Sequence, residues 1–240
     1  YSPRDELNAM VEQARKRGWS RFVVLYPDHG YGRTIERLFD QEVAAAGGIY
    51  CEGVPYPPGT KSFAEYVRTI LETSCDVVLL ADVANQIALI APTFAAEGAW
   101  SVGRGALPEH AEREVHFLLP SPSWSPKLLH RTQRYLQGAL IALPFYESSE
   151  ATLNQHFRTA YETRYGKAPQ AFAAYGYDAY RLISATLRQG HQTRQTLTDA
   201  LKAGSSVTPV TAVDALSVER GPAHPPHVYE VRDDLLERVE

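Results

Sequence analysis

The sequence has little cysteine and no metal-ligand pattern. Of its 240 residues only two are cysteine, Cys51 and Cys75. There is no Cys-x-x-Cys pair, and cysteine and histidine do not cluster at metal-ligand spacing, so we expect no structural zinc and no other metal site. Each cysteine opens an apolar stretch typical of a strand, at 49–54 and 75–81. One disulfide could form, but this pattern favours two buried free thiols.

Long apolar runs and an excess of basic charge are also missing. No stretch approaches the about 18 consecutive apolar residues that a membrane-spanning helix requires. The net charge is −4. The densest basic group, residues 15–17, lies at the end of a predicted helix, where the helix dipole favours positive charge. We therefore expect neither a membrane span nor a nucleic-acid partner.

Fingerprints of nucleotide binding and of serine hydrolases are absent. Gly30 and Gly32 follow a predicted strand, but Ile35 stands near the place of a third glycine, and no Gly-Lys-Ser/Thr is present. There is also no Gly-x-Ser-x-Gly elbow. Asp28, His29 and Tyr31 could by type be an acid, a base and a nucleophile, yet a turn with Gly30 at positive φ is the simpler interpretation. We expect no cofactor and no catalytic centre.

What the sequence does contain is an alternation of apolar runs and helical patterns. Helical spacings of about 10–15 residues separate the runs through the first 145 residues, and strands joined by helices of this length form parallel sheets. The fold class predicted is α/β, a Rossmann-like doubly wound parallel sheet flanked by helices. The strands are expected at 21–26, 49–54, 75–81, 115–119 and 138–144.

The rest of the chain follows another pattern. Residues 151–204 are predicted to be helical, and alternating residues over 209–239 predict a C-terminal antiparallel hairpin. Residues 100–114 are polar and carry glycine and proline, which is typical of a loop. Ser2 and Asp5 begin the first helix, Ser62 and Glu65 form a capping box, and Pro92 makes its helix irregular.

Five segments, in their order and spacing, resemble one known family. They are 26–32, with the sequence YPDHGYG, then 46–48, 56–63, 165–169 and 173–179. Together they are similar to the type I periplasmic binding proteins, above all to the leucine/isoleucine/valine-binding-protein-like group, which serves ABC transporters or forms receptor modules. The resemblance runs over essentially the whole chain and implies two Rossmann-like lobes with a ligand in the cleft between them.

The resemblance also implies a domain plan. Residues 1–145, completed by 206–240, would form the second lobe of the family, and the helices of 146–205 would belong to the other lobe, whose N-terminal half is missing from this chain. Such helices would expose a set of apolar side chains and would dock on a neighbouring chain, swap into an oligomer or fold back. The set is Phe157, Tyr161, Phe172, Tyr175, Tyr177 and Leu182.

The ligand site is predicted at the carboxyl ends of the strands, where ligands of open α/β sheets bind. Three loops lie there, 28–31, 81–85 and 120–124, and their predicted ligand-binding residues are Tyr31, Asp82, Val83, Ser121 and Trp124. By resemblance, Tyr31 packs against the ligand, although an aromatic residue there could equally well support helix packing. Tyr31 and Trp124 could enclose an aromatic or apolar ligand.

The third loop departs from the family pattern. Where amino-acid binders carry an acid for the ligand ammonium group, this chain reads Pro-Ser-Pro-Ser-Trp at 120–124. Asp82 could supply the acid instead, or could simply cap the helix after it. The resemblance implies that a structural helix begins at 176, so Asp178 is interpreted as an acid in its first turn rather than as a ligand contact.

The resemblance implies a non-catalytic protein that binds a small molecule, amino-acid-like or another metabolite, outside the cytoplasm. Its partner would be a membrane permease. Its location would be the periplasm, where a lipoprotein anchor upstream of this chain could hold it at a membrane. The alternative is a module like the penicillin-binding-protein activators, which engages a peptidoglycan-synthesis enzyme instead of a nutrient. An enzyme is the third and weakest hypothesis.

Overall fold

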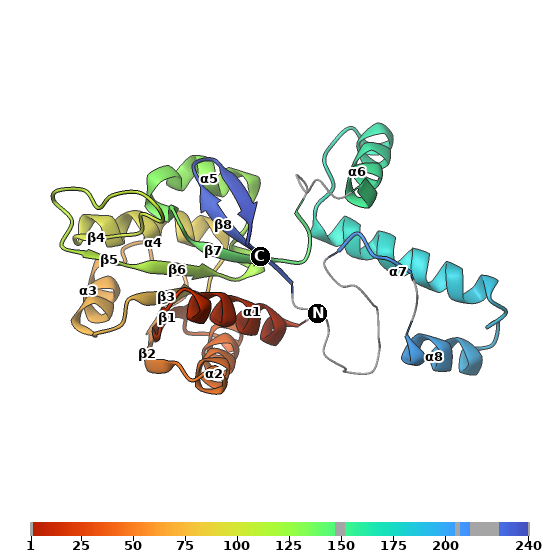
Figure 1. Ribbon diagram of the computed structural model, residues 1–240, viewed down its shortest axis with the longest axis horizontal. Helices are drawn as coiled ribbons and strands as arrows, with labels where there is room; N and C mark the ends of the chain where they lie inside the picture. The colour runs from red at the N-terminus through yellow and green to blue at the C-terminus, as the bar shows by residue number, and fades with distance from the viewer. Residues whose placement is uncertain (1, 147–151, 205–206, 212–225, 240) are drawn as a thin grey trace. The chain divides into compact units, whose positions relative to one another are not determined.

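The computed structural model describes residues 2–146, 152–204, 207–211 and 226–239, which form two compact units (Figure 1). One unit comprises Ser2–Ala142 and His227–Glu240 and contains the sheet; we call it the sheet unit. The other comprises Leu143–Pro226; we call it the helical unit. Each is described by itself.

The sheet unit is built on seven strands in the order β2-β1-β3-β6-β7-β8-β9. The pairs β1–β2, β1–β3, β3–β6 and β6–β7 are parallel, and β8–β9 is antiparallel, which confirms the predicted fold class and closing hairpin. The part of the predicted hairpin region at 212–225 lies outside the described residues. In sheet order the strands are Ile49–Tyr56, Arg21–Pro27, Val77–Leu80, His116–Leu119, Leu140–Leu143, His227–Arg232 and Leu235–Arg238.

Helices cover both faces of this sheet (Figure 1). On one side α1 (Pro3–Lys16) and α2 (Gly30–Ala45) lie against each other, and on the other α4 (Ala84–Ala96) packs against α5 (Pro126–Thr132). The central strands are buried on both faces, because β1 and β3 are almost wholly apolar. Helix α3 (Ala64–Glu72) joins β2 to β3.

Three local predictions meet different outcomes. The capping box at the start of α1 is present, and the Asp5 carboxylate accepts the Ser2 N–H at 2.6 Å. The box predicted from Ser62 is wrong: α3 begins after Phe63, whose ring is buried, and no side chain caps it. Pro92 does not interrupt α4, which runs through it.

The stretch predicted as a loop at 100–114 is closed by a second, two-stranded sheet. Its strands β4 (Ala99–Trp100) and β5 (Arg113–Glu114) pair in parallel. Trp100 is buried, and His110 and Tyr135 pack on its ring with centroid distances of 5.4 and 5.6 Å. The aromatic contacts hold the segment to the unit, which its polar composition does not reveal.

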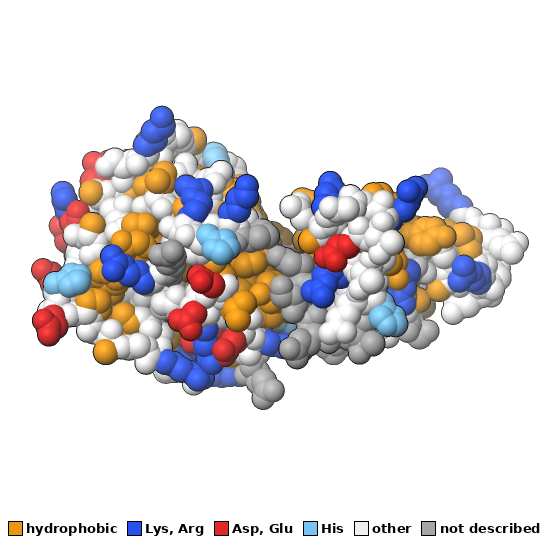
Figure 2. Space-filling view, turned by 90° about the horizontal axis from the view of Figure 1, so that it is seen from above, with side chains coloured by type: hydrophobic (Ala, Val, Ile, Leu, Met, Phe, Trp, Pro, Cys, Tyr) orange, Lys and Arg blue, Asp and Glu red, His pale blue; other side chains and the backbone are white. Residues whose placement is uncertain are grey.

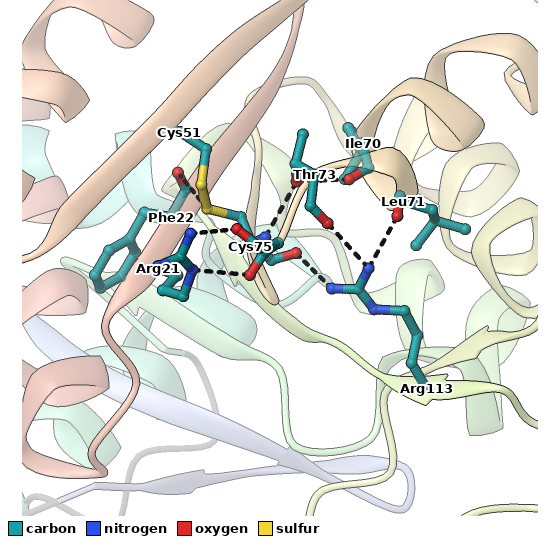
Figure 3. Close-up of a disulfide and its surroundings, with 9 residues drawn as sticks. Arg21, Phe22, Cys51, Ile70, Leu71, Thr73, Cys75 and Arg113 are labelled. Atoms are coloured by element: carbon teal, nitrogen blue, oxygen red, sulfur yellow. Dashed lines mark hydrogen bonds between the residues drawn. A yellow bond between two sulfur atoms is a disulfide. The ribbon is translucent and has the colours of Figure 1, made fainter.

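Cys51 and Cys75 form a disulfide, so the prediction of two free thiols is wrong (Figure 3). Strand β1 lies between β2 and β3, and a bulge shifts its register against β2 between Phe22 and Val24, opposite Cys51. The two Cα atoms lie 6.4 Å apart, within reach of a disulfide. The alternation of apolar residues indicates two separate strands and gives no sign of this bulge.

Two arginine side chains donate hydrogen bonds to backbone carbonyls and so hold the segment around Cys75 (Figure 3). Arg113 donates to the carbonyl oxygens of Leu71, Thr73 and Cys75 at 3.1, 3.3 and 2.7 Å. Arg21 donates to the Ser74 carbonyl at 2.9 Å. These bonds satisfy carbonyls at the end of α3 and fix the chain before it enters β3.

His116, at the start of β6, is partly buried in a stacked contact. The centroid of its ring lies 3.8 Å from that of Trp19, and the two ring planes are inclined by 7°. The Arg17 guanidinium carbon lies over the Trp19 ring, 5.3 Å from its centroid. Burial lowers the pKa of His116 to about 4; nearby Asp76 opposes this shift and Arg17 adds to it. Glu114 approaches the His116 Nδ1 at 3.8 Å.

We expect the free energy of unfolding to fall as the pH is lowered through the range from 6.5 to about 4. The unfolded chain binds a proton at His116 in this range and the folded chain does not, so the stabilisation is complete above pH 6.5 and lost near pH 4. The contribution is about 3 kcal/mol. Urea unfolding of the wild type and of His116→Gln at several pH values measures it, because only the wild type carries this dependence. Parallel pH profiles of the two proteins would contradict the assignment.

The helical unit contains α6 (Thr152–Tyr165), α7 (Ala171–Arg188) and α8 (Arg194–Ala203), as the sequence predicts. Its core is a cluster of Phe145, Phe157, Ala174 and Val210. Helix α7 begins seven residues before Asp178, so the prediction that Asp178 lies in a first turn is wrong. The resemblance implies a helix start at Gly176, but this glycine lies inside α7.

The prediction that six apolar side chains are exposed is only partly right. Phe172 is 86% exposed, whereas Phe157 is 5% and Leu182 7% exposed. Phe157 is buried because it packs against Phe145 and Tyr177, at ring distances of 5.9 and 4.6 Å. Tyr161, Tyr175 and Tyr177 are partly buried. Several further apolar side chains of α7 are exposed: Tyr180, Ile183 and Leu187.

Candidate functional site

The three loops expected to carry the site follow β1, β3 and β6, three neighbouring parallel strands. Their carboxyl ends therefore meet at one edge of the sheet, which we call the carboxyl edge. Tyr31 lies in the first turn of α2, and Asp82 and Val83 lie just before α4. Ser121 opens the short helix η1 (Ser121–Ser123), and Trp124, which is partly buried, ends it.

The first loop leads directly into α2. The His29 Nδ1 accepts the Gly32 N–H at 3.3 Å and so caps the helix, while the Asp28 carboxylate pairs with Arg33 at 2.6 Å. Gly30 is not at positive φ, so the predicted turn is wrong. The glycine that the geometry requires is Gly32, because a Cβ there would lie 2.0 Å from the Pro27 carbonyl oxygen.

Tyr31 lies close to two carboxylates. Its pKa is raised above the usual value for tyrosine by burial first, and then by the negative charges of Glu6 and Asp82. The hydroxyl therefore keeps its proton at physiological pH. The side chain is nevertheless 37% exposed, so that it can still contact a ligand.

Asp82 is held in place from two sides. One carboxylate oxygen accepts the Val83 N–H at 2.6 Å, and the other accepts the hydroxyl proton of Tyr56, which is buried at the end of β2. Burial first, and then this bond, raise the pKa of Tyr56. Asp82 as a residue is partly exposed, and Val83 is 49% exposed. The fixed carboxylate thus belongs to a partly exposed residue near Tyr31.

Glu6 is a member of this site that sequence reasoning missed. It lies in the first turn of α1 and is 5% exposed. Its two carboxylate oxygens accept the Ser121 Oγ–H at 2.5 Å and the Ser121 N–H at 2.8 Å. A signal was present in the sequence, because Glu6 shares the helical face of the buried Met10 and Ala14.

The third loop is also tied to the second. The Ser123 hydroxyl, which is buried, donates to the Asp82 carbonyl at 2.7 Å. Tyr31, Asp82 and Ser121 are therefore brought together with Glu6. Contact between Tyr31 and Trp124 around a ligand stays a prediction.

A cavity of about 610 Å³ lies elsewhere in the sheet unit. It is formed by the loop at 102–105, the turn before β7 and the β8–β9 hairpin, where β7 begins and β8 ends. Its Arg232 is already paired with Glu230 at 3.2 Å, and Arg134 lies 5.5 Å from the Trp100 ring centroid. None of the strand-end loops lines this cavity, and the ligand site at the carboxyl edge stays a prediction.

The described residues contain no group of three or more histidine, cysteine, aspartate or glutamate residues that could hold a metal ion. None of their helices is long and apolar enough to cross a membrane. On the face shown in Figure 2, side chains of both charges are interspersed over the sheet unit.

Comparison with solved structures shows the same fold in binding proteins. A putative branched-chain amino acid ABC transporter protein from Rhodospirillum rubrum superimposes with a TM-score of 0.81 at 23% identity, covering 100% of this chain and 66% of that one. A leucine-binding protein from Thermotoga maritima has a TM-score of 0.72 at 18% identity, covering 99% of this chain and 65% of that one. A substrate-binding protein from Desulfitobacterium hafniense in complex with leucine has a TM-score of 0.69 at 18% identity, covering 99% of this chain and 65% of that one. The chain thus spans just under two thirds of each of these three structures.

Comparison with sequences gives the family. No curated protein matches the chain significantly. A family model described as periplasmic binding protein matches residues 1–234, nearly the whole chain, in agreement with the resemblance found in the sequence. The chain belongs to the periplasmic binding protein family.

Proposed function

We propose that this protein binds a small, amino-acid-like molecule at the carboxyl edge of the sheet unit, without catalysing a reaction. The observation that carries the proposal is the Asp82 carboxylate, which is fixed by Val83 and Tyr56 and belongs to a partly exposed residue near Tyr31. A carboxylate in this position can bind an ammonium group, so Asp82 would supply the acid that loop 120–124 lacks. The solved relatives named for branched-chain amino acids or leucine support this ligand class.

The ligand would be enclosed by a second lobe, to which residues 146–205 would belong. Helix α7 supports this proposal because it exposes large apolar side chains, Phe172 and Tyr180 among them, at 86% and 68%. Exposing such side chains to water costs free energy, and exposed apolar patches commonly mark a surface that another part of a protein covers. Closure of two lobes around a ligand is a common movement of binding proteins.

A non-catalytic role is supported by the way the site uses its reactive groups. The His29 Nδ1 accepts a backbone N–H and so serves as a helix cap. The Ser121 hydroxyl donates to Glu6, whose two oxygens also anchor the Ser121 backbone. Both groups thus have structural partners, which fits ligand binding better than nucleophilic catalysis.

The proposed location is the periplasm, and the proposed partner is the membrane permease of an ABC-type uptake system. The Cys51–Cys75 disulfide supports the location, since disulfides form and persist in oxidising compartments. The activator-like alternative, which engages a peptidoglycan-synthesis enzyme, predicts no small-molecule ligand. It would be supported by capture of such an enzyme without stabilisation by any metabolite.

A metabolite-library thermal-shift screen that includes L-leucine tests the function. We expect a ligand with an ammonium group to raise the melting temperature. Asp82→Asn should weaken the binding of this ligand about tenfold, because a charged hydrogen bond is replaced by a neutral one. The exposed Asp40→Asn on α2 is the matched control and should bind like the wild type. Binding unaffected by Asp82→Asn would contradict the assigned site.

A further inference from the structure

The hydrogen bonds at the carboxyl edge fix which side chains donate and which accept. The Ser121 hydroxyl has one proton, and it is donated to the Glu6 carboxylate at 2.5 Å. The Tyr56 proton is likewise donated to Asp82, and the Ser123 proton to the Asp82 carbonyl at 2.7 Å. A hydroxyl that has donated its proton can offer only its lone pairs to a further partner.

Accessibility selects the groups that remain for a ligand. Tyr56 is 1% and Ser123 0% exposed, so neither is available. Ser121 and Asp82 are partly exposed, and both present oxygen lone pairs. Tyr31 keeps its hydroxyl proton but lies in the field of the Glu6 and Asp82 charges, which repels an anionic group.

Two basic side chains near this edge are engaged. Arg33 pairs with Asp28 at 2.6 Å, and Arg131 donates to the Asn85 side-chain oxygen at 2.7 Å. The starts of α2 and α4 supply backbone N–H groups that can bind an anion, and these are the competing donors. At α4 the Val83 N–H is already taken by the Asp82 carboxylate.

We propose that Glu6 is a positioning residue that sets ligand specificity: it takes the Ser121 proton, so that this edge binds a positively charged hydrogen-bond donor such as a protonated primary amine. The inference rests on the proposed function and specifies the group that the site binds. The contact atoms are the Ser121 Oγ and the Asp82 carboxylate, with Tyr31 beside them. Glu6 itself does not contact the ligand, since it is buried.

Two probes with a branched apolar group, similar size and opposite charge test this preference: isobutylamine and isobutyrate, titrated at pH 7 and constant ionic strength into the ¹⁵N-labelled 240-residue chain. We expect isobutylamine to shift the amide resonances of Tyr31, Val83 and Ser121 and to bind at least about tenfold more tightly than isobutyrate.

Glu6→Gln keeps the shape of the side chain but lets its amide donate to the Ser121 Oγ, which frees the serine proton. It should reduce the amine-to-carboxylate preference to about threefold or less, whereas the exposed Glu72→Gln should leave it unchanged. Ser121→Ala, which removes the acceptor and keeps Glu6, should weaken isobutylamine binding about fivefold without affecting isobutyrate. This variant tests the contact even if Glu6→Gln does not fold.

The outcomes separate the two proposals. If neither probe shifts the carboxyl-edge resonances, the proposed binding site is overturned. If isobutyrate binds there as tightly as isobutylamine, the site stands and the acceptor character inferred here is overturned. An unchanged preference in folded Glu6→Gln, or unchanged amine binding in Ser121→Ala, overturns the role of the Glu6–Ser121 pair.

Discussion

Replacing Asp178 by alanine is expected to destabilise the helical unit by about 3–5 kcal/mol. Asp178 is 3% exposed in the middle of α7. Its carboxylate accepts the Val210 N–H at 2.8 Å, the Thr211 N–H at 3.0 Å and the Thr211 hydroxyl at 2.9 Å. The substitution leaves these donors buried without an acceptor, because Val210 and Thr211 are themselves 3% and 5% exposed.

Hydrogen exchange is the appropriate measurement, because it follows the helical unit separately from the sheet unit. Amides of α7 and residues 210 and 211 should exchange faster in Asp178→Ala, and those of β1 and β3 should not change. Asp199→Ala on α8 is the control: its carboxylate is exposed and, within the described part of the chain, accepts only from Gln195, so its effect should stay within about 0.5 kcal/mol. Equal exchange in the two variants would show that Asp178 does not hold α7 to 210–211.

The elements of the sheet unit could be predicted from the sequence because their patterns are local. The run from Phe22 to Leu25 is apolar without interruption, which is typical of a strand buried on both faces. The alternation of such runs with helices also determines a parallel sheet. What could not be predicted depends on register: the bulge opposite Cys51 decides whether the cysteines meet.

The candidate site shows the same division. The positions of Tyr31, Asp82 and Ser121 after strand ends follow from the order of the elements. The contact between Glu6 and Ser121 joins residues 115 positions apart and depends on how α1 packs beside β6, which no local pattern encodes. The charge on the buried face of α1 indicates only that Glu6 has a partner, not which one.

Asp178 was predicted wrongly for a related reason. The prediction follows the family resemblance, in which the segment at 176–180 begins a helix. In the structure α7 begins earlier, at Ala171, and the acid binds backbone amides of a segment more than 30 residues later. A buried carboxylate that accepts several N–H groups is a tertiary contact, so only the folded chain reveals it.

Removing the disulfide by the double substitution Cys51→Ala and Cys75→Ala is expected to lower the free energy of unfolding by about 3 kcal/mol. The bond joins residues 24 positions apart, and its loss lets the unfolded chain explore more conformations. In the folded protein, we also expect the double substitution to loosen one part of the sheet more than the rest. Strand β2 is at the edge of the sheet, and the disulfide ties it across β1 to the segment before β3.

Urea unfolding with and without dithiothreitol checks this expectation within one experiment. The reductant should lower the midpoint of the wild type to that of the double variant and leave the variant unchanged. Hydrogen exchange should quicken first in β2, because the hydrogen bonds of Arg21 and Arg113 still hold the segment around Cys75 when the disulfide is open. Coincident curves for the oxidised and reduced wild type would mean that this sheet edge is held by packing alone. Tyr56, the last residue of β2, donates to Asp82, so faster opening of β2 should also weaken ligand binding at the carboxyl edge.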